Sequence, residues 1–100
     1  MALTIRQETQ YRGNDRWQWS VWLDGTPEEL DDVDHVMYVL HHTSPNPVRE
    51  IRDRSTSFRL DTFGWGAFRI YARVFHKGGQ ETPLYHDLEL RYPDGTLTTA

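Results

Sequence analysis

The residues of this chain best suited to chemistry are its histidines, which can bind metals or move protons. There are five of them, and the absence of cysteine excludes thiolate zinc sites, disulfides and a cysteine nucleophile. The five are His35, His41, His42, His76 and His86. His41 and His42 are neighbours, so on an extended strand they point to opposite faces, which argues against a shared metal ion. We therefore predict structural histidines, no metal site and no cofactor.

Hydrolytic chemistry is the second alternative. Ser44, His41 and Asp61 supply the residue types of a Ser-His-Asp triad. No glycine elbow precedes Ser44, however, and prolines follow it. A chain of ordinary composition contains such triples by chance, so we predict that this protein is not an enzyme.

Ligand binding is the third alternative, and Trp65 is its best indicator. Trp65 stands between Gly64 and Gly66 in a predicted turn, where a large aromatic side chain is hard to explain as core. Glycine on both sides permits positive φ angles and close approach to the backbone. Trp17 and Trp19 lie two residues apart on an alternating segment and are predicted core residues.

Strands must position these residues, because the chain has the two-residue hydrophobic period of half-buried strands, with turn residues between the segments. The seven segments are 3–11, 17–23, 36–42, 48–52, 57–61, 67–76 and 84–92. Segment 36–42 is apolar on both faces, as expected of a central strand. The pattern predicts an all-β, immunoglobulin-like antiparallel β-sandwich of about 7–8 strands, with no helix beyond a turn or two. We expect one such domain over residues 1–100.

The alternation also assigns side chains to faces. The predicted inward residues are Trp17, Trp19, Val21, Leu23, Phe68, Ile70, Ala72, Val74, Leu84, Leu88 and Leu90. The outward stripe Arg69, Tyr71 and Arg73 could stack RNA bases, but arginines snorkelling over a solvent-facing strand are the commoner explanation. With a net charge of −4 and no dominant basic stripe, we predict no nucleic-acid partner.

Composition narrows the class of protein further. Hydrophobic residues make up 37% of the chain, too many for a disordered segment and too few for a membrane span. The first six residues lack the long apolar segment of a signal peptide. We therefore expect a cytoplasmic protein without a membrane partner. The acids are concentrated in residues 28–34, which is typical of a solvated loop or one turn of helix.

Strand order predicts which loops meet. Antiparallel strands reverse at each connection, so alternate loops share an end of the sandwich. Loops 12–16, 43–47 and 62–66 are therefore expected at one end. The acidic segment and the Gly78-Gly79 hairpin are expected at the other.

Three stretches in this order resemble the YEATS domain family in its compact, prokaryotic form. They are Trp19-Ser20-Val21-Trp22-Leu23, then Val36-Met37-Tyr38-Val39-Leu40-His41-His42-Thr43-Ser44-Pro45-Asn46-Pro47-Val48-Arg49, then Gly64-Trp65-Gly66-Ala67-Phe68. They match the family's W-x-V strand, its L-H-x-S-F strand end followed by P-x-P-x-R, and its G-W/Y-G/A-x-F turn. Leu84-Tyr85-His86-Asp87-Leu88 resembles the family's closing strand, so the resemblance covers about residues 17–92.

The resemblance implies a non-catalytic reader of acylated lysine, mainly acetyl and crotonyl marks on histone tails in eukaryotic members. Carried over by position, the acyl-lysine-binding residues are His41, Thr43, Ser44, Gly64, Trp65, Gly66 and Phe68. By family analogy Trp65 supplies an aromatic face and a backbone N–H for the amide oxygen. The Thr43 hydroxyl, held by His41, accepts the amide N–H. The expected partner is an acylated-lysine peptide or protein, and other protein partners are compatible with it.

Ser44 departs from the family pattern, which has a second aromatic residue at this position. A pocket with one aromatic wall lacks stacking worth about 0.5–1.5 kcal/mol, unless Phe63 or Trp17 takes that place. Two functional hypotheses therefore stay open. The first is a reader of acylated lysine, favoured by residues 64–66 and Thr43. The second is a structural or protein–protein interaction sandwich that has lost acyl-lysine binding, favoured by Ser44.

Overall fold

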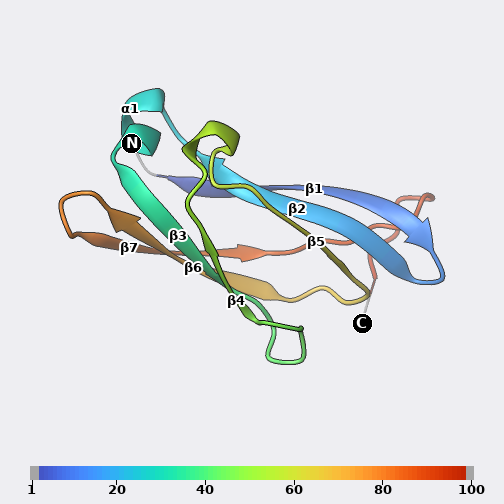
Figure 1. The fold of residues 1–100 in the computed structure, drawn as a ribbon. Helices are drawn as coiled ribbons and strands as arrows, with labels where there is room; N and C mark the ends of the chain where they lie inside the picture. The colour runs from blue at the N-terminus through green and yellow to red at the C-terminus, as the bar shows by residue number, and fades with distance from the viewer. Residues whose placement is uncertain (1–2, 99–100) are drawn as a thin grey trace.

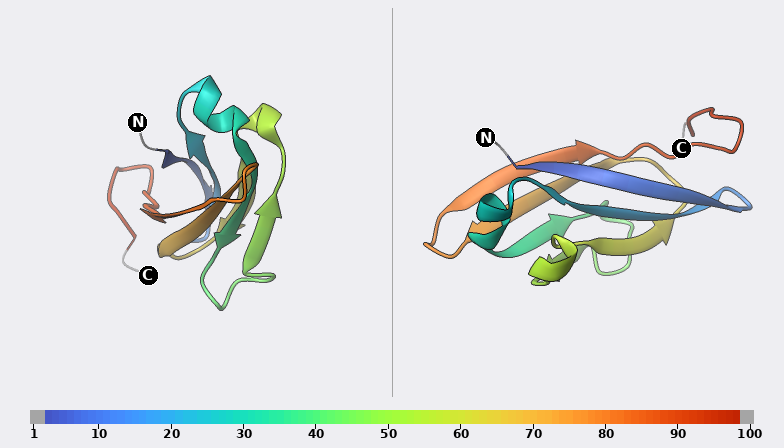
Figure 2. Two further views of the ribbon diagram at one scale, coloured as in Figure 1. Left: turned by 90° about the vertical axis from the view of Figure 1, so that its left-hand side faces the viewer. Right: turned by 90° about the horizontal axis from the view of Figure 1, so that it is seen from above.

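Two antiparallel sheets form the protein, as described by a computed structural model for residues 3–98. The three-stranded sheet has the order β1 (Thr4–Gly13), β2 (Arg16–Asp24) and β5 (Leu60–Gly64). The four-stranded sheet has the order β4 (Val48–Ile51), β3 (Val33–Val39), β6 (Arg69–His76) and β7 (Glu81–Asp87). Figures 1 and 2 show the sheets as two layers. The predicted immunoglobulin-like sandwich is therefore confirmed.

The core lies between the layers and is built by alternate residues of the inner strands. On β2, Trp17, Val21 and Leu23 are at most 1% exposed and Trp19 is 2% exposed. The predicted inward residues of β6 and of the segment after β7 are buried with them, and Phe68 and Leu84 pack against this cluster. The face assignments made from the two-residue period are thus confirmed.

The β3 strand differs from the expectation of two apolar faces. Val36, Tyr38 and Leu40 are buried, whereas Val39 is 37% exposed. No part of residues 3–98 forms a third layer over the outer face of the four-stranded sheet, so only one face of β3 is core (Figure 2). The strand starts earlier than predicted, at Val33, and ends at Val39.

The β5 strand begins three residues later than the predicted segment 57–61. Ser57 and Phe58 have φ angles of 58° and 60°, in the left-handed region that a strand cannot use. They follow a 3₁₀ turn, Arg54–Thr56, whose N-terminus is capped by the Asp53 side chain. This turn lies beside the short helix α1 (Pro27–Asp31), because Arg54 Nε contacts Asp31 Oδ1 at 2.8 Å (Figure 2). Phe58 is then fully buried.

The β7 strand also starts earlier than predicted, and it ends earlier. It includes Pro83, opposite Arg73, because an edge strand has one side on which no ladder hydrogen bond is needed. After Asp87 the chain crosses towards β1. There the Gln7 side chain of β1 bonds to the Glu89 backbone in the way that a neighbouring strand would. Its amide nitrogen donates to the Glu89 carbonyl at 2.8 Å, and its amide oxygen accepts from the Glu89 N–H at 3.0 Å.

The acidic segment forms α1 (Pro27–Asp31), one turn of helix with a capping box between Thr26 and Glu29. The Lys77 N–H donates to the Asp32 carbonyl at 2.8 Å, so this segment lies beside the β6–β7 hairpin. Figure 1 shows both at the end opposite the β1–β2 hairpin, as strand parity predicted. No helix of residues 3–98 is long and apolar enough to span a membrane.

Candidate ligand-binding pocket

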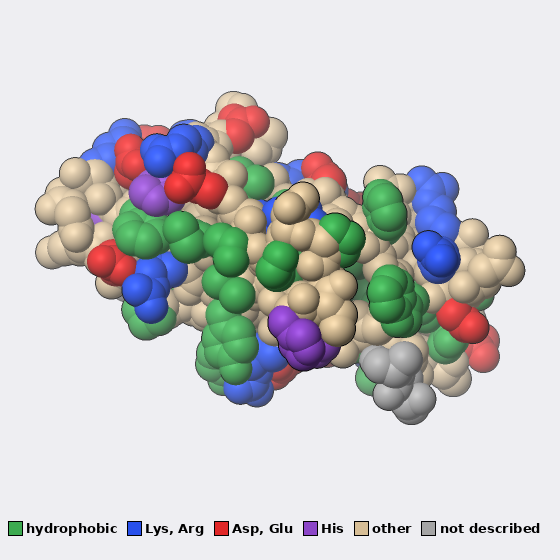
Figure 3. Space-filling view, turned by 60° about the horizontal axis from the view of Figure 1, so that its bottom comes forward, with side chains coloured by type: hydrophobic (Ala, Val, Ile, Leu, Met, Phe, Trp, Pro, Cys, Tyr) green, Lys and Arg blue, Asp and Glu red, His purple; other side chains and the backbone are tan. Residues whose placement is uncertain are grey.

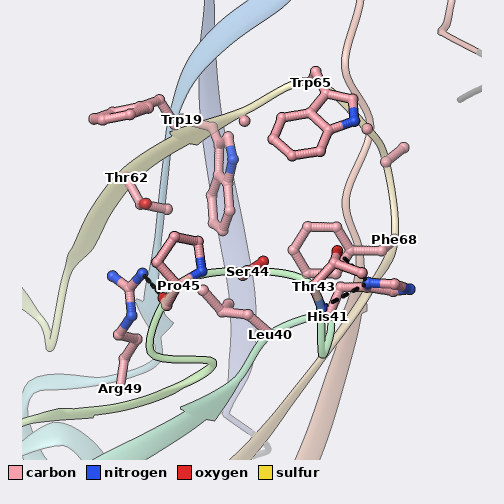
Figure 4. Close-up of a pocket in the computed structure, with 14 residues that line it drawn as sticks. Trp19, Leu40, His41, Thr43, Ser44, Pro45, Arg49, Thr62, Trp65 and Phe68 are labelled. Atoms are coloured by element: carbon pink, nitrogen blue, oxygen red, sulfur yellow. Dashed lines mark hydrogen bonds between the residues drawn. The ribbon is translucent and has the colours of Figure 1, made fainter.

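A pocket of about 210 Å³ opens between the β3–β4 loop and the β5–β6 turn, two of the three loops that parity placed at one end. All seven residues proposed from the sequence line it: His41, Thr43, Ser44, Gly64, Trp65, Gly66 and Phe68. Figure 4 shows Trp19 and Trp65 on opposite sides of the upper part, with Thr43, Ser44 and Pro45 below them. The loop arrangement expected from the sequence is therefore present for these two loops.

The β3–β4 loop is held by its own backbone and by Arg49. The Leu40 N–H donates to the Pro47 carbonyl at 2.7 Å, which closes the loop at its base. The Arg49 guanidinium donates to the carbonyls of Asn46 and Pro45, at 2.5 and 2.7 Å. These bonds fix the proline-rich segment that carries Thr43 and Ser44.

The other wall follows the end of β5. Pairing with β2 places Thr62 opposite Trp19 and Gly64 opposite Trp17. Neither Gly64 nor Gly66 uses the positive φ angle that glycine permits, because the glycines with positive φ in the described chain are Gly13, Gly79 and Gly95. A Cβ on Gly64 would lie 3.7 Å from Trp19 Nε1, which is an ordinary contact distance.

Trp65 is not a core residue, since it is 57% exposed at the pocket. Its backbone N–H, just beyond β5, has no acceptor within residues 3–98. Phe63 beside it is 74% exposed and also lines the pocket. The turn thus presents an aromatic surface and an unused backbone donor.

Thr43 is positioned by His41. The Thr43 N–H donates to His41 Nδ1 at 3.3 Å, and the Thr43 hydroxyl lies 2.7 Å from the same nitrogen. A nitrogen that accepts a backbone N–H carries no proton, so the hydroxyl donates to it. The Thr43 oxygen therefore keeps its lone pairs for an incoming donor.

Aromatic edges complete the inner wall. Phe68 lies edge-on to Trp19 at 6.0 Å and to His41 at 6.1 Å between ring centroids. Arg49 is the only Asp, Glu, Lys or Arg among the described residues that line the pocket. The pocket therefore offers aromatic faces and hydrogen-bonding groups without a carboxylate.

Several pocket residues were missed from the sequence. Leu40, Pro45, Arg49, Thr62 and Ala67 line the pocket, and so does Trp19, which had been assigned to the core alone. For Trp19 the missed signal was its position on β2 opposite Thr62 of β5.

Trp17, by contrast, does not replace the missing aromatic. It is fully buried, and its Nε1 donates to the Arg91 carbonyl at 2.7 Å.

The remaining chemical alternatives find no support in the structure. Asp61 lies outside the pocket lining and pairs with Ser20 and Arg59, so no triad with Ser44 and His41 forms. Residues 3–98 contain no group of three or more His, Cys, Asp or Glu side chains that could hold a metal ion. The histidines outside the loop have other partners: His35 contacts Asp34, His76 contacts Asp32, and His86 contacts Gln7.

Comparisons with known proteins agree on one family. The model of the prokaryotic YEATS domain matches residues 17–89. The chain belongs to this family. It is 33% identical over 76 residues to transcription initiation factor TFIID subunit 14 of Schizosaccharomyces pombe, covering 69% of this chain and 31% of the relative. It is 37% identical over 79 residues to the protein AF-9 homolog of Saccharomyces cerevisiae, covering 72% and 33%. The chain thus spans about a third of the length of these curated relatives.

Solved structures extend the agreement to the fold. The crystal structure of the yeast AF-9 homolog protein Yaf9 has a TM-score of 0.68 at 24% identity, over 94% of this chain and 68% of that chain. The Yaf9 YEATS domain recognizing H3K122suc peptide has a TM-score of 0.64 at 25% identity, over 96% and 72%.

Proposed function

We propose that this domain is a non-catalytic module that binds an acylated lysine side chain of a peptide or protein. The observation that carries the proposal is the Thr43 hydroxyl, which His41 holds with its acceptor lone pairs free at the pocket. A similar domain, that of Yaf9, recognizes an H3K122suc peptide, a ligand with an acylated lysine.

The chemistry of the ligand fits the groups of the pocket. An acyl-lysine presents a neutral, flat amide at the end of an apolar stem, so it needs one acceptor, one donor and an aromatic face. Thr43 Oγ1 accepts the amide N–H, and the unused Trp65 N–H donates to the amide oxygen. The Trp65 ring covers one side of the acyl group. An unmodified, charged lysine finds no carboxylate among the described lining residues, which favours the acylated form.

The test is a peptide titration followed by NMR chemical shifts. Acetyl-lysine and crotonyl-lysine peptides are expected to shift the Thr43 and Trp65 resonances, and the same peptide with free lysine is the matched control. Thr43→Val keeps the side-chain shape without the hydroxyl and is expected to weaken binding by about 1 kcal/mol, roughly fivefold. Thr43→Ser is expected to restore it. Equal binding of acylated and free lysine peptides would refute the proposal.

A second candidate function, a protein–protein interaction sandwich, is favoured by a different surface. An exposed hydrophobic row crosses the outer face of the four-stranded sheet in register, where hydrophobic side chains gather in Figure 3. The row consists of Val48, Val39, Tyr71 and Tyr85, exposed by 53%, 37%, 54% and 60%. Substituting Tyr71 and Tyr85 by Thr tests it, because loss of a partner without loss of acyl-lysine binding assigns the interaction to this face.

A further inference from the structure

The Trp19 indole N–H is an unusual group in this molecule. Its Nε1 is the one buried side-chain nitrogen or oxygen without a hydrogen-bond partner in residues 3–98. Buried indole N–H groups normally find an acceptor, because an unpaired one loses its bond to water without compensation. Trp17, two residues earlier on β2, follows that rule through the Arg91 carbonyl. The indole N–H of Trp19 therefore lacks a partner because of where Trp19 lies on β2, and not because of its residue type.

That place is the inner wall of the pocket. Trp19 is 2% exposed and lines the pocket beside Gly64. A Cβ on Gly64 would lie 3.7 Å from Nε1 and within 4 Å of no other described atom beyond its chain neighbours, so Gly64 is the pocket residue that borders this nitrogen. Figure 4 shows the nitrogen edge of Trp19 turned towards the side of the pocket that carries Trp65.

A second polar group lines the same pocket from the β3–β4 loop. Ser44 is half-buried and lines the pocket, and its hydroxyl has no hydrogen-bond partner among the described residues. A hydroxyl both donates and accepts, whereas an indole N–H only donates. Together they suit an atom that accepts one hydrogen bond and donates another.

We infer that the pocket selects acyl groups that carry a hydroxyl over hydrocarbon acyl groups of the same length. The inference rests on the proposed acyl-lysine binding and names the acyl class. The ligand hydroxyl oxygen accepts from Trp19 Nε1, and its hydrogen is donated to Ser44 Oγ. Thr43 and the Trp65 N–H remain engaged with the amide. Arg49, the cation of the lining, already donates to the carbonyls of Pro45 and Asn46, so a neutral hydroxyl fits this wall better than a carboxylate.

The experiment compares peptides of one sequence that carry β-hydroxybutyryl-lysine, butyryl-lysine, succinyl-lysine or free lysine. The wild-type protein is expected to bind the β-hydroxybutyryl peptide about fivefold more tightly than the butyryl peptide, the typical worth of one hydrogen bond. In NMR spectra the Trp19 indole proton is expected to move downfield with the hydroxylated ligand alone. The Trp17 indole proton, already bonded to Arg91, is the internal control.

Two variants test the two contacts. Trp19→benzothienylalanine keeps the shape of the ring but replaces the N–H by sulfur, and it is expected to abolish the preference. Ser44→Ala is expected to reduce the preference without a change in thermal unfolding. The same replacement at Trp17 is the matched control and is expected to leave the preference intact. The readout is the ratio of two dissociation constants, which a general loss of stability does not change.

The possible failures are distinguishable. If no acylated peptide binds more tightly than free lysine, both proposals fall. If butyryl-lysine binds as well as its hydroxylated counterpart, or the preference survives in the Trp19 variant, only the hydroxyacyl inference falls. If succinyl-lysine binds most tightly, charge selects the ligand and the inference is also overturned.

Discussion

Replacing Trp65 by alanine separates a pocket role from a packing role most directly. We expect the variant to fold, because Trp65 is 57% exposed in the β5–β6 turn and lies outside the buried core cluster. A fully buried tryptophan withdraws roughly 200 Å² from water, and Trp65 withdraws less than half of its area. At roughly 25 cal/mol per Å², the loss in the free energy of unfolding is at most about 2 kcal/mol.

Trp17→Ala provides the scale for comparison. Trp17 is fully buried, and its removal leaves a cavity and an unpaired Arg91 carbonyl. Such a change costs about 3–5 kcal/mol. Because a domain of this size is stable by only about 5–15 kcal/mol, Trp17→Ala approaches unfolding whereas Trp65→Ala does not.

Binding is expected to respond in the opposite order. Trp65→Ala removes the aromatic wall, a loss of about 0.5–1.5 kcal/mol in stacking beyond the apolar area that the ligand no longer covers. We expect acyl-lysine binding to become undetectable. Trp65→Phe keeps a smaller face and is expected to retain part of it. Urea unfolding and peptide titration of the same samples are the assays. If Trp65→Ala lowers the free energy of unfolding as much as Trp17→Ala, Trp65 is a packing residue and the reader proposal loses its main aromatic contact.

Three further predictions concern other parts of the chain. Ser44→Phe is expected to tighten binding of a crotonyl-lysine peptide by about two- to tenfold, because it adds a second aromatic wall. Unchanged affinity in a calorimetric titration would show that position 44 does not face the acyl group. Burial lowers the pKa of His86, so the folded state favours the neutral ring. Its contribution to stability is therefore complete above the unfolded pKa of about 6.5 and decreases as the pH falls below it. The urea midpoint should decline less between pH 7.5 and 5.5 in His86→Gln than in the wild type, and equal declines would contradict this assignment. Neutralising the acidic segment at the far end should leave peptide binding nearly unchanged, since its field is screened within about 8 Å. A tenfold loss of affinity would show that the ligand reaches that end. The substitutions are Glu28→Gln, Glu29→Gln, Asp31→Asn and Asp32→Asn.

The parts of the fold that sequence predicted are those where hydrophobic period and turn chemistry agree. On β2 every second residue from Trp17 to Leu23 is buried, and period two alone specifies this. The β1–β2 turn lies within the expected loop 12–16, and its residues Gly13, Asn14 and Asp15 all have positive φ angles. The antiparallel order of the strands then predicted that the two pocket loops lie together. This prediction needs only the number of times the chain changes direction between them.

The parts that sequence did not predict depend on tertiary contacts. Ser57 and Phe58 carry no local sign of a left-handed backbone, yet burial of Phe58 and the Asp53 cap hold them there. Proline normally interrupts a strand because it has no backbone N–H, and Pro83 is tolerated in β7 only because β7 is an edge strand. The position of Trp19 in both core and pocket also depends on tertiary contacts. Whether a buried ring packs against the core or lines a cavity is decided by the size of the side chains beside it in the fold.

Trp19 also shows why fold and pocket cannot be assigned to separate residues here. Its ring belongs to the same buried cluster as Trp17 and also lines the pocket. A core selected for stability alone would pair this N–H, and no described residue does so. The unpaired Trp19 N–H lowers the stability of the ligand-free protein, and this loss is removed when a ligand supplies an acceptor. A ligand that pairs this N–H therefore stabilises the folded domain by more than its contacts at Thr43 and Trp65 alone.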